Sequence, residues 1–191
     1  TPRGVRRPSA RGGATMTHPV PLLTLQRFLQ RHPALRMATI EVTDNRITGR
    51  YDVGTDRLLL MRQEAYPDEG AYFHSVFHEL IHATGHPTRL NRPHLARSAT
   101  NFDFTAANRR DQLVAISDMS VEEIVAELGS FTLLQECEVP IPATRWHEVE
   151  CYLSHYLEAF EKTGHAAVLG LATAEAIRAV TYVLNRGVCY P

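Results

Sequence analysis

The stretch that most constrains this chain is residues 72–86, YFHSVFHELIHATGH. Its apolar residues recur with the spacing of a buried helix face. Four histidines stand one helical turn apart within it: His74, His78, His82 and His86. Residues four apart project from one side of a helix, so adjacent histidines can bind one metal ion. The alternative is a set of ordinary hydrogen-bonded histidines, but imidazoles in such apolar surroundings need a reason to be buried. The stretch therefore predicts a helix over residues 70–85 that carries a metal site.

Only one histidine pair has a carboxylate directly after its first member, in the pattern His78-Glu79-x-x-His82. In this pattern two histidines on a helix bind Zn²⁺ and the glutamate acts as the general base of a hydrolytic reaction. We therefore predict that His78 and His82 are zinc ligands and that Glu79 is catalytic. Gly85 is expected to end the helix and to turn His86 away from the other histidines. We therefore consider His86 only as a residue that hydrogen-bonds a ligand or as an alternative ligand.

A catalytic zinc site needs a third protein ligand. One longer signature would place a histidine six residues beyond His82, but Thr88 occupies that position. The alternative is a glutamate on a second helix, and residues 122–127 (EEIVAE) provide such a segment. Glu123 and Glu127 stand one turn apart, so one can bind the metal while the other hydrogen-bonds a ligand histidine. We predict Glu123 as the ligand and Glu127 as its helper.

The rest of the chain predicts one α+β domain with a small, mostly antiparallel sheet ahead of the metal helix. Strands are expected at 37–43, 47–53 and 57–61, and further helices at 21–30, 106–116, 120–136, 144–163 and 173–185. Ser120, with Glu123 three residues later, forms a capping-box pattern that would start the helix over 120–136. That pattern gives Glu123 a structural role as an alternative to metal binding.

Composition is that of one globular domain, with 191 residues, 44% hydrophobic and 21% charged. The longest uninterrupted apolar runs are short and the start has no export signal, so we expect no membrane association. Three cysteines lack the paired spacing of a metal knuckle: Cys137, Cys151 and Cys189. They are expected to be free thiols, which indicates the cytoplasm.

Charge is distributed unevenly along the chain. No acidic residue precedes Glu41, whereas seven arginines do, and the remainder carries a net negative charge. Residues 1–20 are rich in proline, glycine and arginine and are expected to form a disordered basic leader before a domain over 21–191. The acidic balance of the domain argues against a broad nucleic-acid footprint.

Two segments resemble a known family. Residues 72–92, from Tyr72 through His78-Glu79-x-x-His82 to Arg92, are very similar to the zincin-like metallopeptidase domain of ArdC-type antirestriction proteins and of polyvalent plasmid and phage proteins. Residues 122–129 resemble the second motif of that domain, and the resemblance covers roughly residues 45–187. It implies a gluzincin-type fold in which two histidines and a downstream glutamate bind zinc.

The leading hypothesis is a zinc-dependent peptidase acting on a protein or peptide substrate, and a host-directed effector peptidase would share its chemistry. The alternative is a nucleic-acid-associated accessory protein with a structural or vestigial zinc site. It would bind single-stranded DNA weakly through the basic leader and through Arg89, Arg92 and Arg97. ArdC-type proteins carry a single-stranded-DNA-binding domain before the peptidase-like one. The residues before position 45 are too few for it, so that domain is expected to be absent.

Peptide hydrolysis also needs a group that stabilises the oxyanion. The sequence leaves five candidates for that role: Tyr72, His74, His86, His147 and His155. Three aromatic residues on the helix predicted over 144–163 have the spacing of either base-stacking or core residues: Trp146, Tyr152 and Tyr156.

Overall fold

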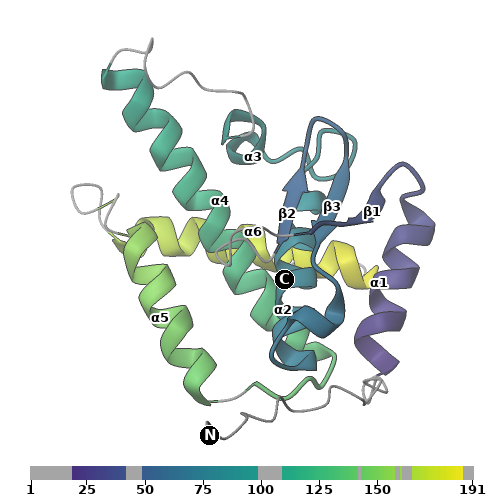
Figure 1. Ribbon diagram of the computed structural model, residues 1–191. Coiled ribbons are helices and arrows are strands. Elements are labelled where there is room, and N and C mark those ends of the chain that lie inside the picture. The colour runs from purple at the N-terminus through teal and green to yellow at the C-terminus, as the bar shows by residue number, and fades with distance from the viewer. Residues whose placement is uncertain are drawn as a thin grey trace, which may run out of the picture.

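The computed structural model describes residues 19–41, 49–98, 109–141, 143–157, 160 and 165–186 (Figure 1). The elements are α1 (Pro19–Arg31), β1 (Arg36–Thr39), β2 (Gly49–Asp52), β3 (Arg57–Leu60), the 3-10 turn η1 (Gln63–Ala65), α2 (Glu69–Thr84), α3 (Pro93–Ser98), α4 (Arg109–Glu136), α5 (Ala143–Leu157) and α6 (His165–Leu184). The α+β class is confirmed. The expected leader, apart from residues 19–20, lies outside the described residues, as does Cys189.

The three strands form a mixed sheet in the order β1-β3-β2. β2 and β3 form an antiparallel hairpin, whereas β1 runs parallel to β3. The sequence predicted mostly antiparallel pairing. The difference arises because β3 is the most apolar strand, with Leu58 and Leu60 buried, and takes the central position. β1 can then pair only with the other edge of β3.

Helix α2 begins and ends close to the predicted bounds. The Asp68 side chain accepts a hydrogen bond from the Ala71 amide at 2.7 Å, which caps the N-terminus. Gly85 ends the helix in a right-handed conformation, with φ −76°, so a left-handed turn is not the reason for a glycine there. The reason is space, because a Cβ on Gly85 would lie 2.9 Å from Nη2 of Arg92 and from Cδ2 of Leu95.

The second long helix differs from the prediction. α4 is one continuous helix over Arg109–Glu136, and it replaces the two helices expected at 106–116 and 120–136. Ser120 is buried in its middle, so the capping-box interpretation is wrong. Burial explains the outcome: Asp118 and Ser120 lie against neighbouring elements, and Asp118 pairs with His94 at 2.8 Å. Tertiary contacts thus satisfy residues that would otherwise favour a helix start.

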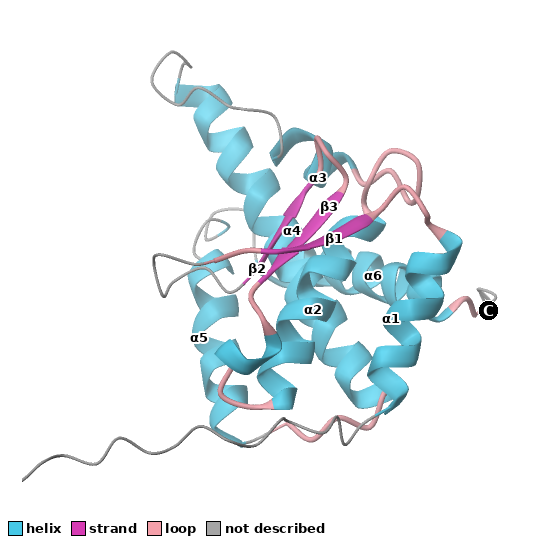
Figure 2. Cartoon of the chain, turned by 45° about the vertical axis from the view of Figure 1, so that its right-hand side comes forward, coloured by secondary structure: helices cyan, strands magenta, loops and turns pink. Residues whose placement is uncertain are grey.

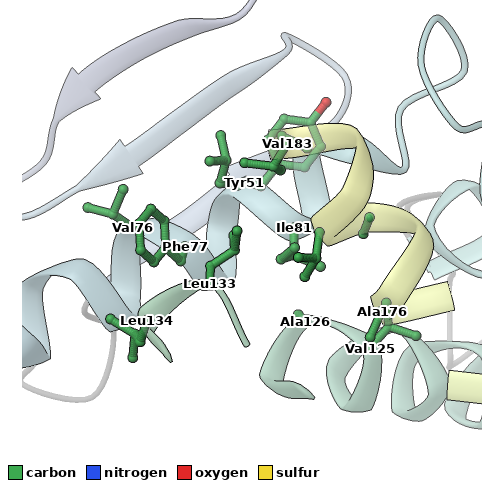
Figure 3. Packing of buried hydrophobic residues seen from close by; sticks show 14 of the residues in the cluster. Tyr51, Val76, Phe77, Ile81, Val125, Ala126, Leu133, Leu134, Ala176 and Val183 are labelled. Carbon is green, nitrogen blue, oxygen red and sulfur yellow. The ribbon is translucent and has the colours of Figure 1, made fainter. Parts of the chain in front are cut away.

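The core lies where α2, α4 and α6 meet below the sheet (Figures 1 and 2). Figure 3 shows side chains from these elements pointing toward one another: Val76, Phe77 and Ile81 from α2, Val125, Ala126, Leu133 and Leu134 from α4, and Ala176 and Val183 from α6. α1 and α5 lie on opposite sides of this centre (Figure 1). Helix α2, with its histidines, is therefore held between the sheet and the helices that follow it.

Helix α6 begins at His165, eight residues before the predicted start at 173, and one of its faces is buried. Its residues Ala166–Leu184 are long and apolar enough to cross a membrane by length and composition, which inspection of uninterrupted apolar runs did not detect. The buried face packs on α4 and α2, as expected of a core helix. Cys137 and Cys151 are free, as predicted.

Candidate metal centre

The histidines of α2 face three glutamates of α4. His74 lies beside Glu127, His78 beside Glu127 and Glu123, and His82 beside Glu123 and Glu122. Because the histidine numbers rise as the glutamate numbers fall, the two helices run antiparallel along this contact. Gly129 allows the close approach: a Cβ on that residue would lie 2.8 Å from Cδ1 of Ile81.

Among the described residues, His78, His82 and Glu123 form the group that could hold a metal ion. Their donor atoms converge, with Nε2 of His78 and Nε2 of His82 3.2 Å apart. The Glu123 carboxylate places Oε2 3.4 Å from the first nitrogen and Oε1 3.5 Å from the second. Ligands at zinc bond lengths in a tetrahedron are about 3.3–3.4 Å from one another. The three donors therefore have the spacing of one face of a tetrahedral metal site.

The other ring nitrogen of each histidine faces a second carboxylate. Nδ1 of His78 lies 3.1 Å from Oε2 of Glu127, and Nδ1 of His82 lies 3.1 Å from Oε1 of Glu122. An ionised carboxylate only accepts hydrogen bonds, so each Nδ1 carries a proton and donates it. A divalent cation in the space between the two Nε2 atoms would hold both rings neutral, with the Nε2 lone pairs as its ligands. The donor set fits a divalent metal.

The carboxylates of the site are ionised at neutral pH. Burial raises the pKa of Glu123, but the adjacent His82 and His78 outweigh burial and lower the pKa to about 2. For Glu127, His74 and His78 likewise outweigh burial and lower the pKa to about 2. Burial also opposes a raised pKa of His78, yet Glu123 and Glu127 hold it well above its usual value. The site thus carries negative charge that a bound cation would offset.

Glu122 and Arg92 were not predicted as part of the site. Arg92 is only 1% exposed, and its Nε and Nη2 donate to the two oxygens of Glu122 at 3.0 and 2.5 Å. The alternative hypothesis of DNA binding used Arg89, Arg92 and Arg97. The side chains of Arg89 and Arg92 are buried, and Arg89 is paired with Asp56 at 2.6 Å, so these two are not available to bind phosphate. The Arg97 side chain lies outside the described part.

Tyr152 of α5 also reaches the metal centre. Its hydroxyl donates to Oε2 of Glu123 at 2.5 Å, and its ring centroid lies 6.2 Å from that of His78. Tyr156 packs against it, with ring centroids 4.8 Å apart. From the sequence, Tyr152 is expected to be a base-stacking or core residue and not part of the metal centre. Trp146 lies elsewhere, 43% exposed beside Phe131. The spacing of Tyr152 and Trp146 in the sequence does not indicate that only Tyr152 reaches the metal centre.

The predicted oxyanion candidates occupy other places. Tyr72 packs against Tyr66 and Phe73, and His147 and His155 are exposed on α5. His86, also the alternative ligand, lies past the end of α2, with Nδ1 2.8 Å from Oγ1 of Thr88 and outside the metal-binding group. His74 lies one turn behind the donors, with Nε2 3.3 Å from Oε1 of Glu127.

Glu79, the predicted catalytic base, is buried between α2 and the sheet. Its Cγ lies 3.2 Å from the place that a Cβ on Gly49 of β2 would take, so β2 passes close to this side chain. Burial next to His78, whose pKa Glu79 helps to raise, places its charge at the metal centre. Glu79 is not part of the group of described residues whose donor atoms converge on a metal position.

The fold and the site define a class of protein. The family model described as zincin-like metallopeptidase matches residues 30–172, most of the chain, and the protein belongs to that family. The zincin-like fold implies a divalent metal, and the resemblance seen in the sequence is confirmed.

A solved structure gives the more particular likeness. The crystal structure of the antirestriction protein ArdC from plasmid R388, in its Mn(II)-bound form, matches with a TM-score of 0.57 and 17% sequence identity. The match covers 98% of this chain and 59% of that one, so this chain spans about three fifths of the ArdC chain. A search of curated proteins found no match.

Proposed function

We propose that this protein is a zinc-dependent peptidase. The observation that carries the proposal is the convergence of two Nε2 atoms and one carboxylate, at 3.2–3.5 Å from one another, beside a buried glutamate that is not a ligand. Three protein ligands with an open position are typical of a catalytic zinc, whereas structural zinc sites are closed by four. We assign His78, His82 and Glu123 as the ligands.

The chain's own residues divide the chemistry as follows. A zinc ion held here would polarise the substrate carbonyl and acidify a bound water. Glu79 accepts the proton of the attacking water and returns it to the amine nitrogen as the peptide bond breaks. The Tyr152 hydroxyl, which donates its single proton to Glu123 in the free site, would turn that proton to the developing oxyanion once substrate is bound. Burial raises the pKa of Tyr152, and Glu123 raises it further, so the phenol stays a donor.

An extended peptide suits the surroundings of the site. β2 is an edge strand of the sheet and passes close to Glu79. A peptide can add to such an edge through backbone hydrogen bonds, which bind a chain without regard to its side chains. We therefore propose a protein or peptide substrate bound along β2.

The free thiols Cys137 and Cys151 support a reducing compartment, the cytoplasm.

The first test is metal content. We expect wild-type protein to contain stoichiometric zinc and the variants His82→Ala and Glu123→Ala to lose it. Glu79→Gln should keep the metal and fold but lose hydrolysis of a protein substrate or an unbiased peptide library. Zinc retained by Glu123→Ala would move the third ligand elsewhere. Hydrolysis retained by Glu79→Gln would refute its role as the base. Manganese, the ion in the R388 protein, is compared with zinc in the same assays.

An antirestriction role is the second candidate, because the R388 protein bears that name and its fold matches nearly the whole of this chain. Burial of Arg89 and Arg92 removes two of the cations that DNA binding would use. Retention on a single-stranded DNA column, with and without residues 1–20, tests the candidate. Salt-sensitive retention that depends on the leader and persists in Glu79→Gln would support the antirestriction candidate. No retention would argue against it and leave the peptidase as the remaining proposal.

A further inference from the structure

We propose that Arg92 and Glu122 are positioning residues that aim the imidazole of His82 at the metal, and that they couple the loop after α2 to metal affinity. The inference rests on the proposed metal site. It concerns two residues that do not touch the metal themselves, and its observation is a buried chain of contacts from Arg92 through Glu122 to His82.

Glu122 is fixed at both oxygens. Oε1 accepts from Nδ1 of His82 at 3.1 Å and from Nη2 of Arg92 at 2.5 Å, while Oε2 accepts from Nε of Arg92 at 3.0 Å. A guanidinium that holds both oxygens of a carboxylate also sets the plane of that carboxylate. Because Glu122 is 2% exposed, solvent does not compete for these bonds. The direction in which Nε2 of His82 points is therefore determined by Arg92 through Glu122.

Arg92 is itself held against the end of the helix that carries His82. Its Nη1 donates to Oγ1 of Thr84 at 2.6 Å and its Nη2 to the carbonyl of Ile81 at 2.7 Å. That carbonyl is one of those a helix C-terminus leaves without a backbone partner, so the arginine satisfies it. The guanidinium of Arg92 lies where a side chain on residue 85 would be, and this space is open because residue 85 is a glycine.

The loop over residues 85–92 is built to return Arg92 to this position. The Leu90 amide donates to the Thr84 carbonyl at 2.9 Å, and the Arg92 amide donates to the Gly85 carbonyl at 3.0 Å. Asn91 has φ 50°, the left-handed conformation that closes such a turn. A change in this loop is thus transmitted to Glu122 and from there to the ligand.

The two ligand histidines are supported differently. Glu127, the partner of His78, also faces His74 and has no arginine beside it among the contacts of the described residues. Glu122 has its own buried counter-charge, the guanidinium of Arg92, which holds both of its oxygens. Breaking a buried pair leaves one charge uncompensated. The support of His82 is therefore the more rigid of the two.

Loss of such a partner typically weakens metal binding by about 10- to 100-fold. We expect that range for Glu122→Gln, which keeps the shape of the side chain but loses the charge, and for Arg92→Met. Since the two residues act in one chain of contacts, the double variant should lose no more affinity than the worse single variant. The variants should also change the visible absorption of the Co²⁺-substituted protein, which reports ligand geometry.

Arg89 provides the matched control. It is buried in the same loop and holds that loop through a bidentate pair with Asp56, at 3.0 and 2.6 Å. None of the hydrogen bonds among the described residues joins it to Glu122. Arg89→Met should destabilise the loop and leave zinc affinity and the Co²⁺ spectrum close to wild type. Circular dichroism before and after metal addition shows whether each variant is folded, and Arg92→Lys replaces Arg92→Met if the latter is not.

The experiment is a competition between full-length protein and a chromophoric chelator for zinc. Affinity reduced at least 10-fold in folded Glu122→Gln and in a folded Arg92 variant, with Arg89→Met near wild type, supports the inference. Wild-type affinity in both positioning variants overturns it, as does an equal loss in Arg89→Met, which would mean that loop anchoring alone matters. Wild-type protein that binds no zinc overturns the proposed function itself, and the two failures are thereby distinguished.

Discussion

The close packing of α4 on α2 at Gly129 predicts how an alanine at this position changes the stability of the protein. A Cβ on this residue would lie 2.8, 2.9 and 3.2 Å from the Cδ1, Cγ1 and Cγ2 atoms of Ile81, which is fully buried. Overpacking of this kind costs about 1–3 kcal/mol, and the helix propensity of alanine over glycine returns about 1 kcal/mol. We expect Gly129→Ala to destabilise the protein by up to about 2 kcal/mol in net terms.

The same geometry predicts a change of sign. Ile81→Ala removes all three contacting atoms and should by itself cost about 2–5 kcal/mol. In that background the three closest contacts of the new Cβ are removed, so the propensity term dominates and the substitution should stabilise by up to about 1 kcal/mol. The double-mutant cycle then gives a coupling energy equal to the overpacking cost, about 1–3 kcal/mol. Gly170→Ala on α6 is the control, because nothing lies within 4 Å of a Cβ there, and it should stabilise in either background.

The assay is urea unfolding monitored by circular dichroism, with chelator present so that metal binding adds nothing to stability. Zinc affinity is measured separately, because a wider gap between α2 and α4 moves the Glu123 carboxylate away from the histidines. Gly129→Ala should therefore also weaken zinc binding. The argument is refuted if Gly129→Ala stabilises the wild-type protein as Gly170→Ala does, or if it costs as much in the Ile81→Ala background as without it.

Three further predictions follow from the described contacts. Glu79→Gln should reduce peptide hydrolysis to background while zinc content stays stoichiometric, as measured by metal analysis beside a protease assay. Tyr152→Phe removes the hydrogen bond to Glu123, and kcat should fall by more than zinc affinity does; a loss of affinity with unchanged kcat would refute the oxyanion role. Burial raises the pKa of Asp56, but Arg89 outweighs it and lowers the pKa, so the unfolded chain binds the proton more readily. This pair should stabilise the fold above the ordinary aspartate pKa and lose its effect as the pH falls through the lower folded pKa, so Asp56→Asn should flatten the acid limb of stability against pH.

The metal helix could be predicted because its signals are local. Apolar periodicity, an aspartate cap and histidines one turn apart lie within one short stretch, and α2 begins and ends within a residue of expectation. The parallel pairing of β1 with β3 could not be read in this way, because it depends on which strand takes the centre of the sheet. The capping-box pattern at Ser120 failed for a related reason: burial of the middle of α4 outweighed a local preference for a helix start.

Arg92 shows most clearly what the sequence does not contain. An arginine in a proline-rich polar loop is usually solvated, as the alternative hypothesis of DNA binding would require of Arg92. Its burial depends on Glu122, 30 positions away, and on the space that Gly85 leaves. Glu122 itself stands directly before the predicted ligand, where the one-turn spacing used to find Glu123 and Glu127 gives no signal.

The register of the two helices determines whether the site exists. Three glutamates on α4 serve two histidines on α2, because Glu123 faces both rings while Glu122 and Glu127 approach one ring each from either side. A slip of α4 by one turn would leave His78 opposite Glu123 but bring Met119 opposite His82, four residues before Glu123, and His82 would lose its shared carboxylate. Gly129 and Ile81 lie in close contact in the same helix pair, and such a slip would break this contact. Packing of these two helices and metal binding therefore depend on the same register, and a substitution that shifts it should reduce both.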